Sequence, residues 1–324
     1  MGQIRYFNTL RLLAAFSVVL LHSSATYFYS GIYSEKDYFP FGFYYTFNVF
    51  AVPVFLMISG ALFLRSDKEL NYPILLKKYV RRIAAALLLF GLPMCFIDSI
   101  FNNEPLCTGL VNFLRGHSWD HIWYLYMLIS LYLLTPICKE FTNHASRQTI
   151  RITLIVLFVM SSILPTLKYF GVKLENWMTL SPYLLIYMLG YYLTFMDNDR
   201  IKILHLILTI IVCVILTFFK LTIDIKEVLY FEPTGIILSI AIFLLFKKVN
   251  ITCTIADQLN PYCFGIYLIH PVFTNTINRI LHFNPANYFN AWISIPLLAI
   301  VIFISSLACC YILRKIPFLR NHVL

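Results

Sequence analysis

Charged residues are scarce in this chain of 324 residues. Aspartate, glutamate, lysine and arginine together make up 12% of it, against about a quarter in an ordinary soluble domain. Hydrophobic residues make up 60%, and the mean hydropathy is +0.77. A soluble fold of this size cannot bury so much apolar surface. The composition therefore excludes a soluble globular protein and indicates one that lies in a lipid bilayer.

Acidic residues are the scarcer of the two charge types, with 15 against 25 basic residues and a formal net charge of +10. The basic residues do not form one patch, as nucleic-acid binding would require, but fall in short clusters between apolar runs. We therefore expect no nucleic-acid partner. The chain also lacks any C-x-x-C pair among its eight cysteines. The only close pair, Cys309 and Cys310, lies in an apolar run, which favours small packing residues over disulfides or metal ligands.

Long apolar runs are what the sequence has in abundance. A helix needs roughly 20 mostly apolar residues to cross a bilayer, and none of the runs alternates as a barrel strand does. The sequence predicts an all-α, polytopic integral membrane protein with about ten spans. The predicted spans are 6–28, 43–64, 83–101, 121–138, 150–167, 178–196, 203–219, 229–246, 261–281 and 291–313.

The basic residues also predict the orientation, because loops on the cytoplasmic side carry an excess of lysine and arginine. With the N-terminus inside, 17 basic residues fall in inside segments and 7 in outside segments, and Arg11 lies within the membrane. We therefore expect both ends in the cytoplasm. We expect residues 1–324 to form one transmembrane domain without an appended soluble domain. The first apolar run is too long for a cleavable signal peptide.

Two residues of the first predicted helix, Arg11 and His22, are expensive in hydrocarbon and are therefore candidates for function. Eleven residues make almost three helical turns, so both side chains lie on one face, about 16 Å apart along the axis. Arg11 falls in the cytoplasmic third and His22 in the outer third. A neutral imidazole near pH 7 suits a general base, and a guanidinium suits a bound or developing negative charge.

Other polar residues in or near the predicted spans have competing interpretations. His270, beside Pro271, either lines a site or packs in the core. His117, Asp120 and His121 lie at the outer end of the fourth span. They lack a third firm metal ligand, so we expect acceptor binding or interfacial hydrogen bonds there and no metal.

Two carboxylates inside predicted spans, Asp98 and Glu232, have no partner in the sequence pattern. They are expected to pair with cations on other helices. One such cation is Arg11, which in that case is structural and not part of a site.

Four segments together resemble the membrane acyltransferase-3 family. Arg11 and His22 match its R-x10-H pattern, and three further stretches resemble its signatures in the same order along the chain. These stretches are Val52-Pro-Val-Phe-Leu-Met-Ile-Ser-Gly60, His121-Ile-Trp-Tyr-Leu-Tyr126 and Tyr262-Cys-Phe-Gly-Ile-Tyr-Leu-Ile-His-Pro271. Each is weak alone, but together they cover nearly the whole chain.

The resemblance implies an enzyme of a bacterial inner (cytoplasmic) membrane. It would move an acyl group, most simply acetyl from acetyl-CoA, to a hydroxyl of a surface polysaccharide or glycolipid. The implied roles are His22 and Arg11 in catalysis, Lys78, Arg81 and Arg82 in binding the acyl-CoA phosphates, and His121, Trp123, Tyr267 and His270 in binding the acceptor. Membrane lipid, acyl-CoA and the glycan acceptor are then the expected partners, and no metal is implied.

The match has departures, and alternatives remain open. Family members often have an aspartate where this chain has Asn8, and Lys78 replaces the first arginine of the family's R-x-x-R pattern. Lysine keeps the charge but loses the planar fork of donors. The positive-inside bias would place cations there in any case. An exporter or flippase of a polysaccharide or its precursor is the second interpretation, and a sensor or structural membrane protein is the third. The sequence leaves the oligomeric state undetermined.

Overall fold

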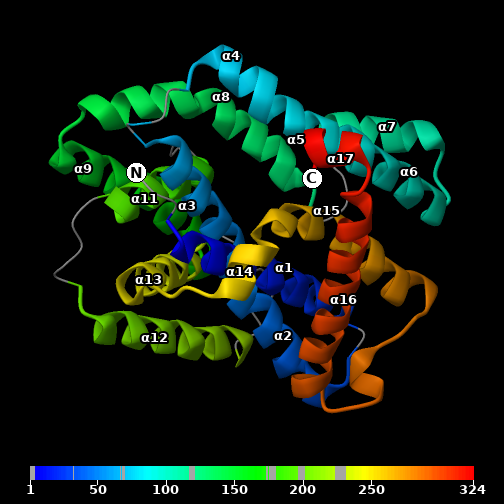
Figure 1. The fold of residues 1–324 in the computed structure, drawn as a ribbon. Coiled ribbons are helices and arrows are strands. Elements are labelled where there is room, and N and C mark those ends of the chain that lie inside the picture. Colours follow the sequence, from blue (N-terminus) through cyan, green and yellow to red (C-terminus); the bar gives the residue numbers. More distant parts are fainter. Residues whose placement is uncertain are drawn as a thin grey trace.

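The structure, a computed structural model, describes residues 4–31, 33–65, 67, 70–116, 121–172, 174, 180–195, 201–222 and 231–324. Helices account for almost all of this part, and no residue in it belongs to a strand (Figure 1). The prediction of an all-α protein is confirmed.

Six helical segments in the described part are long and apolar enough to cross a membrane. They are α1 (Tyr6–Ser30), Glu35–Phe63 with α2 (Tyr38–Phe47) and α3 (Ala51–Phe63), Tyr72–Phe101 with α5 (Arg81–Ala86) and α6 (Leu92–Phe101), Arg147–Phe170 with α9 (Arg147–Phe158), α12 (Ile203–Thr222), and α16 (Ala291–Leu313). A seventh is the pair α13 (Pro233–Val249) and Thr254–Ile280, joined at a bend of 117°. The latter contains α14 (Thr254–Leu259) and α15 (Cys263–Asn275). A multi-pass membrane protein is thereby supported.

The remaining predicted spans are helical, but they do not meet the same criteria in the part of the chain described. The predicted span 121–138 falls in α8 (Trp123–His144), which is long enough but more polar. The predicted span 178–196 contains α11 (Pro182–Phe195), which has 14 residues. The count of ten spans and the orientation therefore stay predictions.

Contacts between loops agree with the predicted alternation of segments between two faces. Lys139 donates to the carbonyl of Arg65 at 2.6 Å, and the sequence predicts that both lie on the inside. Arg279 pairs with Asp98 at 2.7 Å, at the ends of two spans predicted to meet outside. These contacts group the segments by side but do not tell which side is cytoplasmic.

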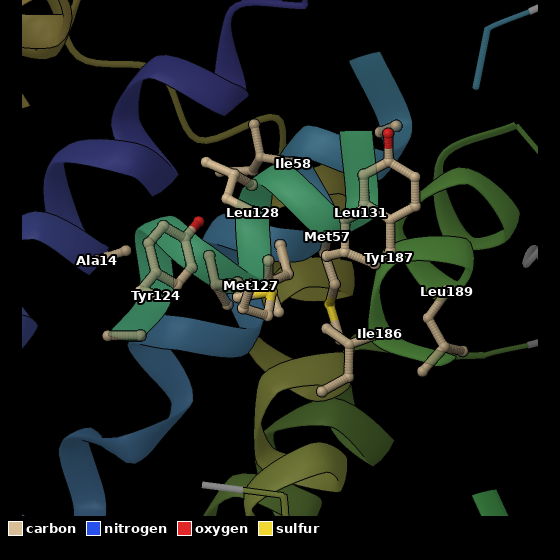
Figure 2. Close-up of a cluster of buried hydrophobic side chains, with 14 of the residues drawn as sticks. Ala14, Met57, Ile58, Tyr124, Met127, Leu128, Leu131, Ile186, Tyr187 and Leu189 are labelled. Atoms are coloured by element: carbon tan, nitrogen blue, oxygen red, sulfur yellow. The ribbon is translucent and has the colours of Figure 1, made fainter. Parts of the chain in front are cut away.

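Two glycines allow α3 and α11 to cross with their backbones in contact. A Cβ atom on Gly60 would lie 1.7 Å from the carbonyl oxygen of Tyr187, and one on Gly190 would lie 1.8 Å from that of Met57. Small residues are favoured at helix crossings in membranes because such crossings gain packing and not hydrophobic burial. Figure 2 shows the surrounding cluster, in which α8 packs its apolar side chains against both helices. This crossing sets the position of the α3 wall described below.

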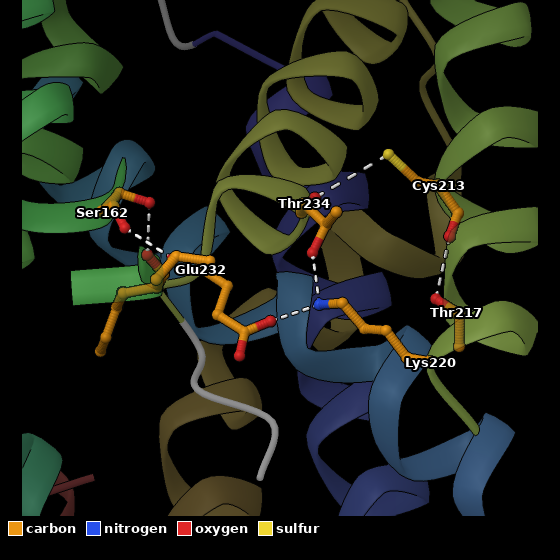
Figure 3. A network of polar contacts seen from close by, with 8 residues as sticks. Ser162, Cys213, Thr217, Lys220, Glu232 and Thr234 are labelled. Carbon is orange, nitrogen blue, oxygen red and sulfur yellow. Dashed lines mark hydrogen bonds and ion pairs between the residues drawn. The ribbon is translucent and has the colours of Figure 1, made fainter. Parts of the chain in front are cut away.

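The two membrane carboxylates have partners, and neither partner is Arg11. Glu232, at the N-terminus of α13, accepts a charged hydrogen bond from Lys220 of α12, and Lys220 also donates to Thr234 at 2.9 Å (Figure 3). Asp98 pairs with Arg279. The polar network of Figure 3 attaches α12 to the rest of the protein. Most of the apolar surface of this helix is exposed. The interpretation of Arg11 as a partner of either carboxylate is wrong.

Candidate active site

A cavity of about 250 Å³ lies between α1, α3, α5, α8 and α15. Its wall brings together residues that are far apart in the sequence and come from these five helices or the segments next to them. Its lining includes Arg11, His22, Phe55, Ser59, Tyr79, Arg82, His121, Trp123, Tyr124, Tyr132, Phe264 and Tyr267. Six of the nine predicted site residues are therefore on its wall: Arg11, His22, Arg82, His121, Trp123 and Tyr267.

Arg11 and His22 line the same cavity from one helix, as their spacing on α1 predicts. Arg11 donates to the amide oxygen of Asn260 at 2.6 Å. It has no ion pair in the part of the chain that the structure describes. A partly buried guanidinium held by one neutral acceptor keeps most of its donors available for an anion or a carbonyl.

His22 belongs to a cluster of three imidazoles from three elements. Its ring centroid lies 5.3 Å from that of His270 on α15 and 6.4 Å from that of His121, which precedes α8. The rings of His121 and His270 are 5.3 Å apart. No sequence spacing indicates this cluster, because the three residues are separated by about 100 residues or more.

The four residues predicted to bind the acceptor have different positions. His121 is buried, and its main-chain carbonyl accepts a hydrogen bond from the hydroxyl of Tyr267. Trp123 lines the cavity and packs its ring 5.9 Å from that of Tyr183. His270 is fully buried and is not part of the cavity lining.

Of the three basic residues predicted to bind the donor, only Arg82 reaches the cavity. It donates to the carbonyl of Val323 at 2.9 Å and lies 5.6 Å from the centre of the Phe264 ring. Arg81 and Lys78 are exposed outside the lining, and Lys78 lies 5.5 Å from the Tyr79 ring centre.

Sequence reasoning missed Arg314, Asn260 and a row of aromatic residues. Arg314 lies close enough to Arg82 for their charges to interact, and it sits 5.0 Å from the centre of the Tyr262 ring. Tyr124 and Tyr132 line the cavity eight residues apart on α8, with Leu128 between them. A spacing of four residues places side chains on one helix face, so this row was visible in the sequence. The place of Asn260 was not visible, because it depends on how the segment Asn260–Tyr262, just before α15, docks against α1.

The departure at Asn8 has a local explanation. Asn8 is buried, and its amide donates to Asp257 of α14 at 2.8 Å, while Arg5 pairs with the other oxygen of that carboxylate at 2.7 Å. An aspartate at position 8 would meet Asp257 as a second negative charge. Asparagine at position 8 avoids this repulsion and donates a hydrogen bond to Asp257 instead.

The described residues contain no group of three histidine, cysteine or acidic side chains arranged to hold a metal ion. His117 and Asp120, the other members of the H-x-x-D-H segment, lie outside the described residues.

Comparison with known proteins gives one finding. A family model described as an acyltransferase domain, that of the acyltransferase-3 type, matches residues 4–315. No curated protein and no solved structure gives a significant match.

Proposed function

This chain belongs to the acyltransferase-3 family of membrane acyltransferases, and on that premise we propose which group it transfers, from what donor and to what acceptor. The group is an acyl group, most simply acetyl, from cytoplasmic acyl-CoA. The acceptor is a hydroxyl of a surface polysaccharide or glycolipid at a bacterial inner membrane. One observation carries the proposal: a single cavity has arginines in its wall together with His22 and His121.

The cavity is large enough for the pantetheine arm of acyl-CoA but not for the whole molecule. Its volume of about 250 Å³ is below the usual range of roughly 300–1,000 Å³ for pockets that bury a drug-sized ligand. A linear pantetheine arm and a small acyl group suit such a space. The nucleotide then stays at the mouth, where Arg82 and Arg314 offer positive charge and guanidinium donors to its phosphates.

Arg11 places the donor and does not polarise the reacting carbonyl. Side chains on a helix lean towards its N-terminus, so Arg11 leans away from His22, which lies about 16 Å further along α1. Its bond to Asn260 holds it there. It can therefore meet the amide carbonyls of the arm while the thioester lies near His22.

His22 is the general base of the transfer. It takes the proton of the acceptor hydroxyl as the oxygen attacks the thioester carbon, which forms the new ester bond. The tetrahedral intermediate collapses by breaking the carbon–sulfur bond, and the proton returns to the leaving thiolate. The reaction needs no metal and no redox partner.

A second hollow supports a glycan as acceptor. It measures about 460 Å³ and is lined by polar and aromatic side chains, including Asp37, Asn287, Tyr288, Asn290 and Trp292. Most of its lining comes from two connections between predicted spans, one after the span 6–28 and one before the span 291–313. The sequence predicts that both connections face outward. Aromatic faces combined with amide and carboxylate groups suit a sugar, which has both apolar ring faces and hydroxyls.

The test is transfer of label from radioactive acetyl-CoA to glycan by the purified protein in nanodiscs. We expect His22→Ala to lower kcat by at least about 100-fold, the usual loss for a general base. The matched control is His205→Ala, which removes an exposed imidazole on α12 that is not part of the cavity lining. Wild-type turnover by folded His22→Ala protein would refute the role of His22. In sealed proteoliposomes, movement of unlabelled glycan across the membrane without acyl transfer would instead identify an exporter.

A further inference from the structure

An apolar groove lies beside the outer hollow, the site of about 460 Å³ proposed above for the acceptor. The groove measures about 360 Å³, within the range of roughly 300–1,000 Å³ for sites that hold small molecules. One wall is the first half of α16, and the other is the segment that follows α15 and leads to α16. Eight of its nine lining residues have side chains without a polar atom, and the ninth is Ser294.

The groove opens on the surface that faces lipid tails. The lining residues of α16 follow one helix face over about 10 Å of its axis, three or four residues apart: Ser294, Leu297, Leu298 and Val301. Leu297 and Val301 are more than half exposed, as is Leu281 on the opposite wall. Because α16 is long and apolar enough to span a membrane, these exposed side chains meet hydrocarbon. The occupant that suits this wall is therefore a hydrocarbon chain.

The groove and the outer hollow are continuous at Phe289, which belongs to the lining of both. The connection before α16 changes character along its length. Phe283 and Pro285 line the groove, whereas Asn287 and Asn290 line the hollow. A molecule that has both a sugar and a hydrocarbon chain can occupy both sites at once. A soluble polysaccharide has no part that suits the groove.

The groove also has one hydrogen-bond donor that its own helix does not use. Ser294 is 6% exposed, and its buried hydroxyl has no hydrogen-bond partner among the described residues. Several serines of this protein donate to the carbonyl four residues earlier, as Ser306 of α16 does to Ile302 at 2.7 Å. For Ser294 that carbonyl belongs to Asn290, and it already accepts the main-chain amides of Ile293 and Ser294. A buried donor left unpaired is unfavourable, so the hydroxyl favours an occupant with an acceptor oxygen.

The position of Ser294 suits the linkage of such a molecule. Ser294 lies one turn, about 6 Å, further along α16 than Asn290, which lines the hollow. The oxygen atoms that join a sugar to its hydrocarbon chain lie at the boundary between the two parts. A bound glycolipid would therefore place a linkage oxygen between the hollow and the groove, within one helical turn of both.

We propose that the acceptor is a lipid-linked glycan, an inference that rests on the proposed function and selects one of its two kinds of acceptor. The hydrocarbon chain lies in the groove, Ser294 donates to an oxygen of the linkage, and the sugar lies in the outer hollow. Lipid tails are as apolar as the groove, so burial of the chain adds little affinity over the bilayer. The preference for a glycolipid over a phospholipid comes from the sugar in the hollow.

The first test does not depend on acyl transfer. An alkyl maltoside with a diazirine in its chain, and phosphatidylglycerol with a diazirine in the same place, are photolysed with the purified protein in nanodiscs. Mass spectrometry identifies the labelled peptides. We expect the maltoside to label residues 277–301 several times more strongly than the phospholipid does. Equal labelling by the two probes would mean that the groove holds bulk lipid only, and would overturn the proposal.

A variant with a filled groove makes this test specific. Val301→Trp places a large ring in the groove at an exposed position and should remove the preference for the maltoside. The matched control is Ile304→Trp, which adds the same ring at an exposed position of α16 that does not line the groove, and it should keep the preference. Loss of the preference in both variants, or in neither, would contradict the assignment of the groove.

The second test compares lipid-linked and chain-free forms of one acceptor. Radioactive acetyl-CoA is supplied with glycolipid extracted from cell membranes, or with the glycan released from that same extract. We expect kcat/KM to be at least about tenfold lower for the released glycan, which is the lower end of what a misfit in an apolar pocket costs. Val301→Trp should raise the KM for the glycolipid by a similar factor and leave the donor KM unchanged. Equal kcat/KM values for the two forms would overturn the proposal.

Ser294→Ala separates a ligand contact from a structural role. It should raise the KM for the glycolipid roughly 2- to 10-fold, the value of one hydrogen bond, with kcat within about twofold of wild type. The free energy of unfolding should not fall, because the variant removes a buried hydroxyl without a partner. The matched control is Ser306→Ala, which removes a buried hydroxyl bonded within α16 and should keep the wild-type KM.

Two further outcomes separate this inference from the proposed function. An unchanged glycolipid KM in Ser294→Ala would refute the contact at the linkage. A wild-type protein that transfers no label to either form of the acceptor refutes the proposed function alone, because the photolabelling still decides what occupies the groove.

Discussion

Replacing Gly60 with alanine should separate two helices whose backbones touch. The added Cβ atom would lie 1.7 Å from the carbonyl oxygen of Tyr187 and 2.6 Å from its carbon. A carbon and an oxygen without a bond normally stay about 3.3 Å apart or more, so the helices must move by roughly 1.6 Å. The obstacle is backbone, and no side-chain rotation relieves it.

The cost follows from that displacement. Forcing an extra carbon into a packed core costs about 1–3 kcal/mol, and a clash with rigid backbone belongs at the upper end, so we expect about 3 kcal/mol. The same shift moves Phe55 and Ser59, which line the cavity from α3. A displacement of about 1 Å in a catalytic site can lower the rate 100-fold, so molecules that fold should also lose kcat.

The assay is unfolding in mixed micelles, with kcat measured on the same preparations. Gly91→Ala is the matched control, because its added carbon would meet only side-chain atoms at 3.3 Å and beyond. We expect that control to stay within about 1 kcal/mol of wild type. If Gly60→Ala unfolds at the same denaturant concentration as Gly91→Ala, the two helices are not in backbone contact and the reasoning fails.

Three further predictions concern the donor, the membrane ion pair and the acceptor. Arg11→Lys should fold normally but raise the donor KM by about 10- to 100-fold, the value of a charged hydrogen bond, and Arg11→Ala should raise it further; an unchanged donor KM with a lower melting temperature would make Arg11 structural. Glu232→Ala leaves Lys220 without its carboxylate and should cost about 3–5 kcal/mol with little change in kcat. Adding Lys220→Met should restore most of that stability. An unchanged free energy of unfolding in Glu232→Ala would show that the ion pair does not hold α12. Tyr288→Ala removes a side chain that is 64% exposed, so it should leave stability unchanged and raise the acceptor KM about fivefold; an unchanged acceptor KM would exclude the outer hollow as its binding site.

The sequence predicted well wherever one helix carried the whole pattern. The helical period alone places Arg11 and His22 on one face of α1, and both line the cavity. The same reasoning fails between helices. Lys78, Arg81 and Arg82 form one basic cluster in the sequence, but only Arg82 turns into the cavity. A regular α-helix would place Lys78 and Arg82 on one face, but Lys78 lies in the π-helical segment Leu75–Val80, which has a different number of residues per turn.

Partners between distant segments lay beyond the sequence for a related reason. A carboxylate inside a membrane needs a cation as its partner. The sequence therefore predicted that Asp98 and Glu232 each form an ion pair. It did not say which cation, because Lys220 is selected by the docking of α12 and Arg279 by the docking of the helical segment that follows α15. His270 shows the same limit: its residue type made it a candidate for the cavity wall, and its helix turns it behind that wall.

The sequence by itself determined that this protein is helical, that it lies in a membrane and that it belongs to a family of acyltransferases. It could do so because the bilayer imposes length and apolarity on each span separately, and because the family's motifs are short and local. Only the tertiary structure decided that three histidines form one cluster beside Arg11's cavity. That arrangement depends on glycine-mediated helix crossings and on the register between helices, which no single segment encodes.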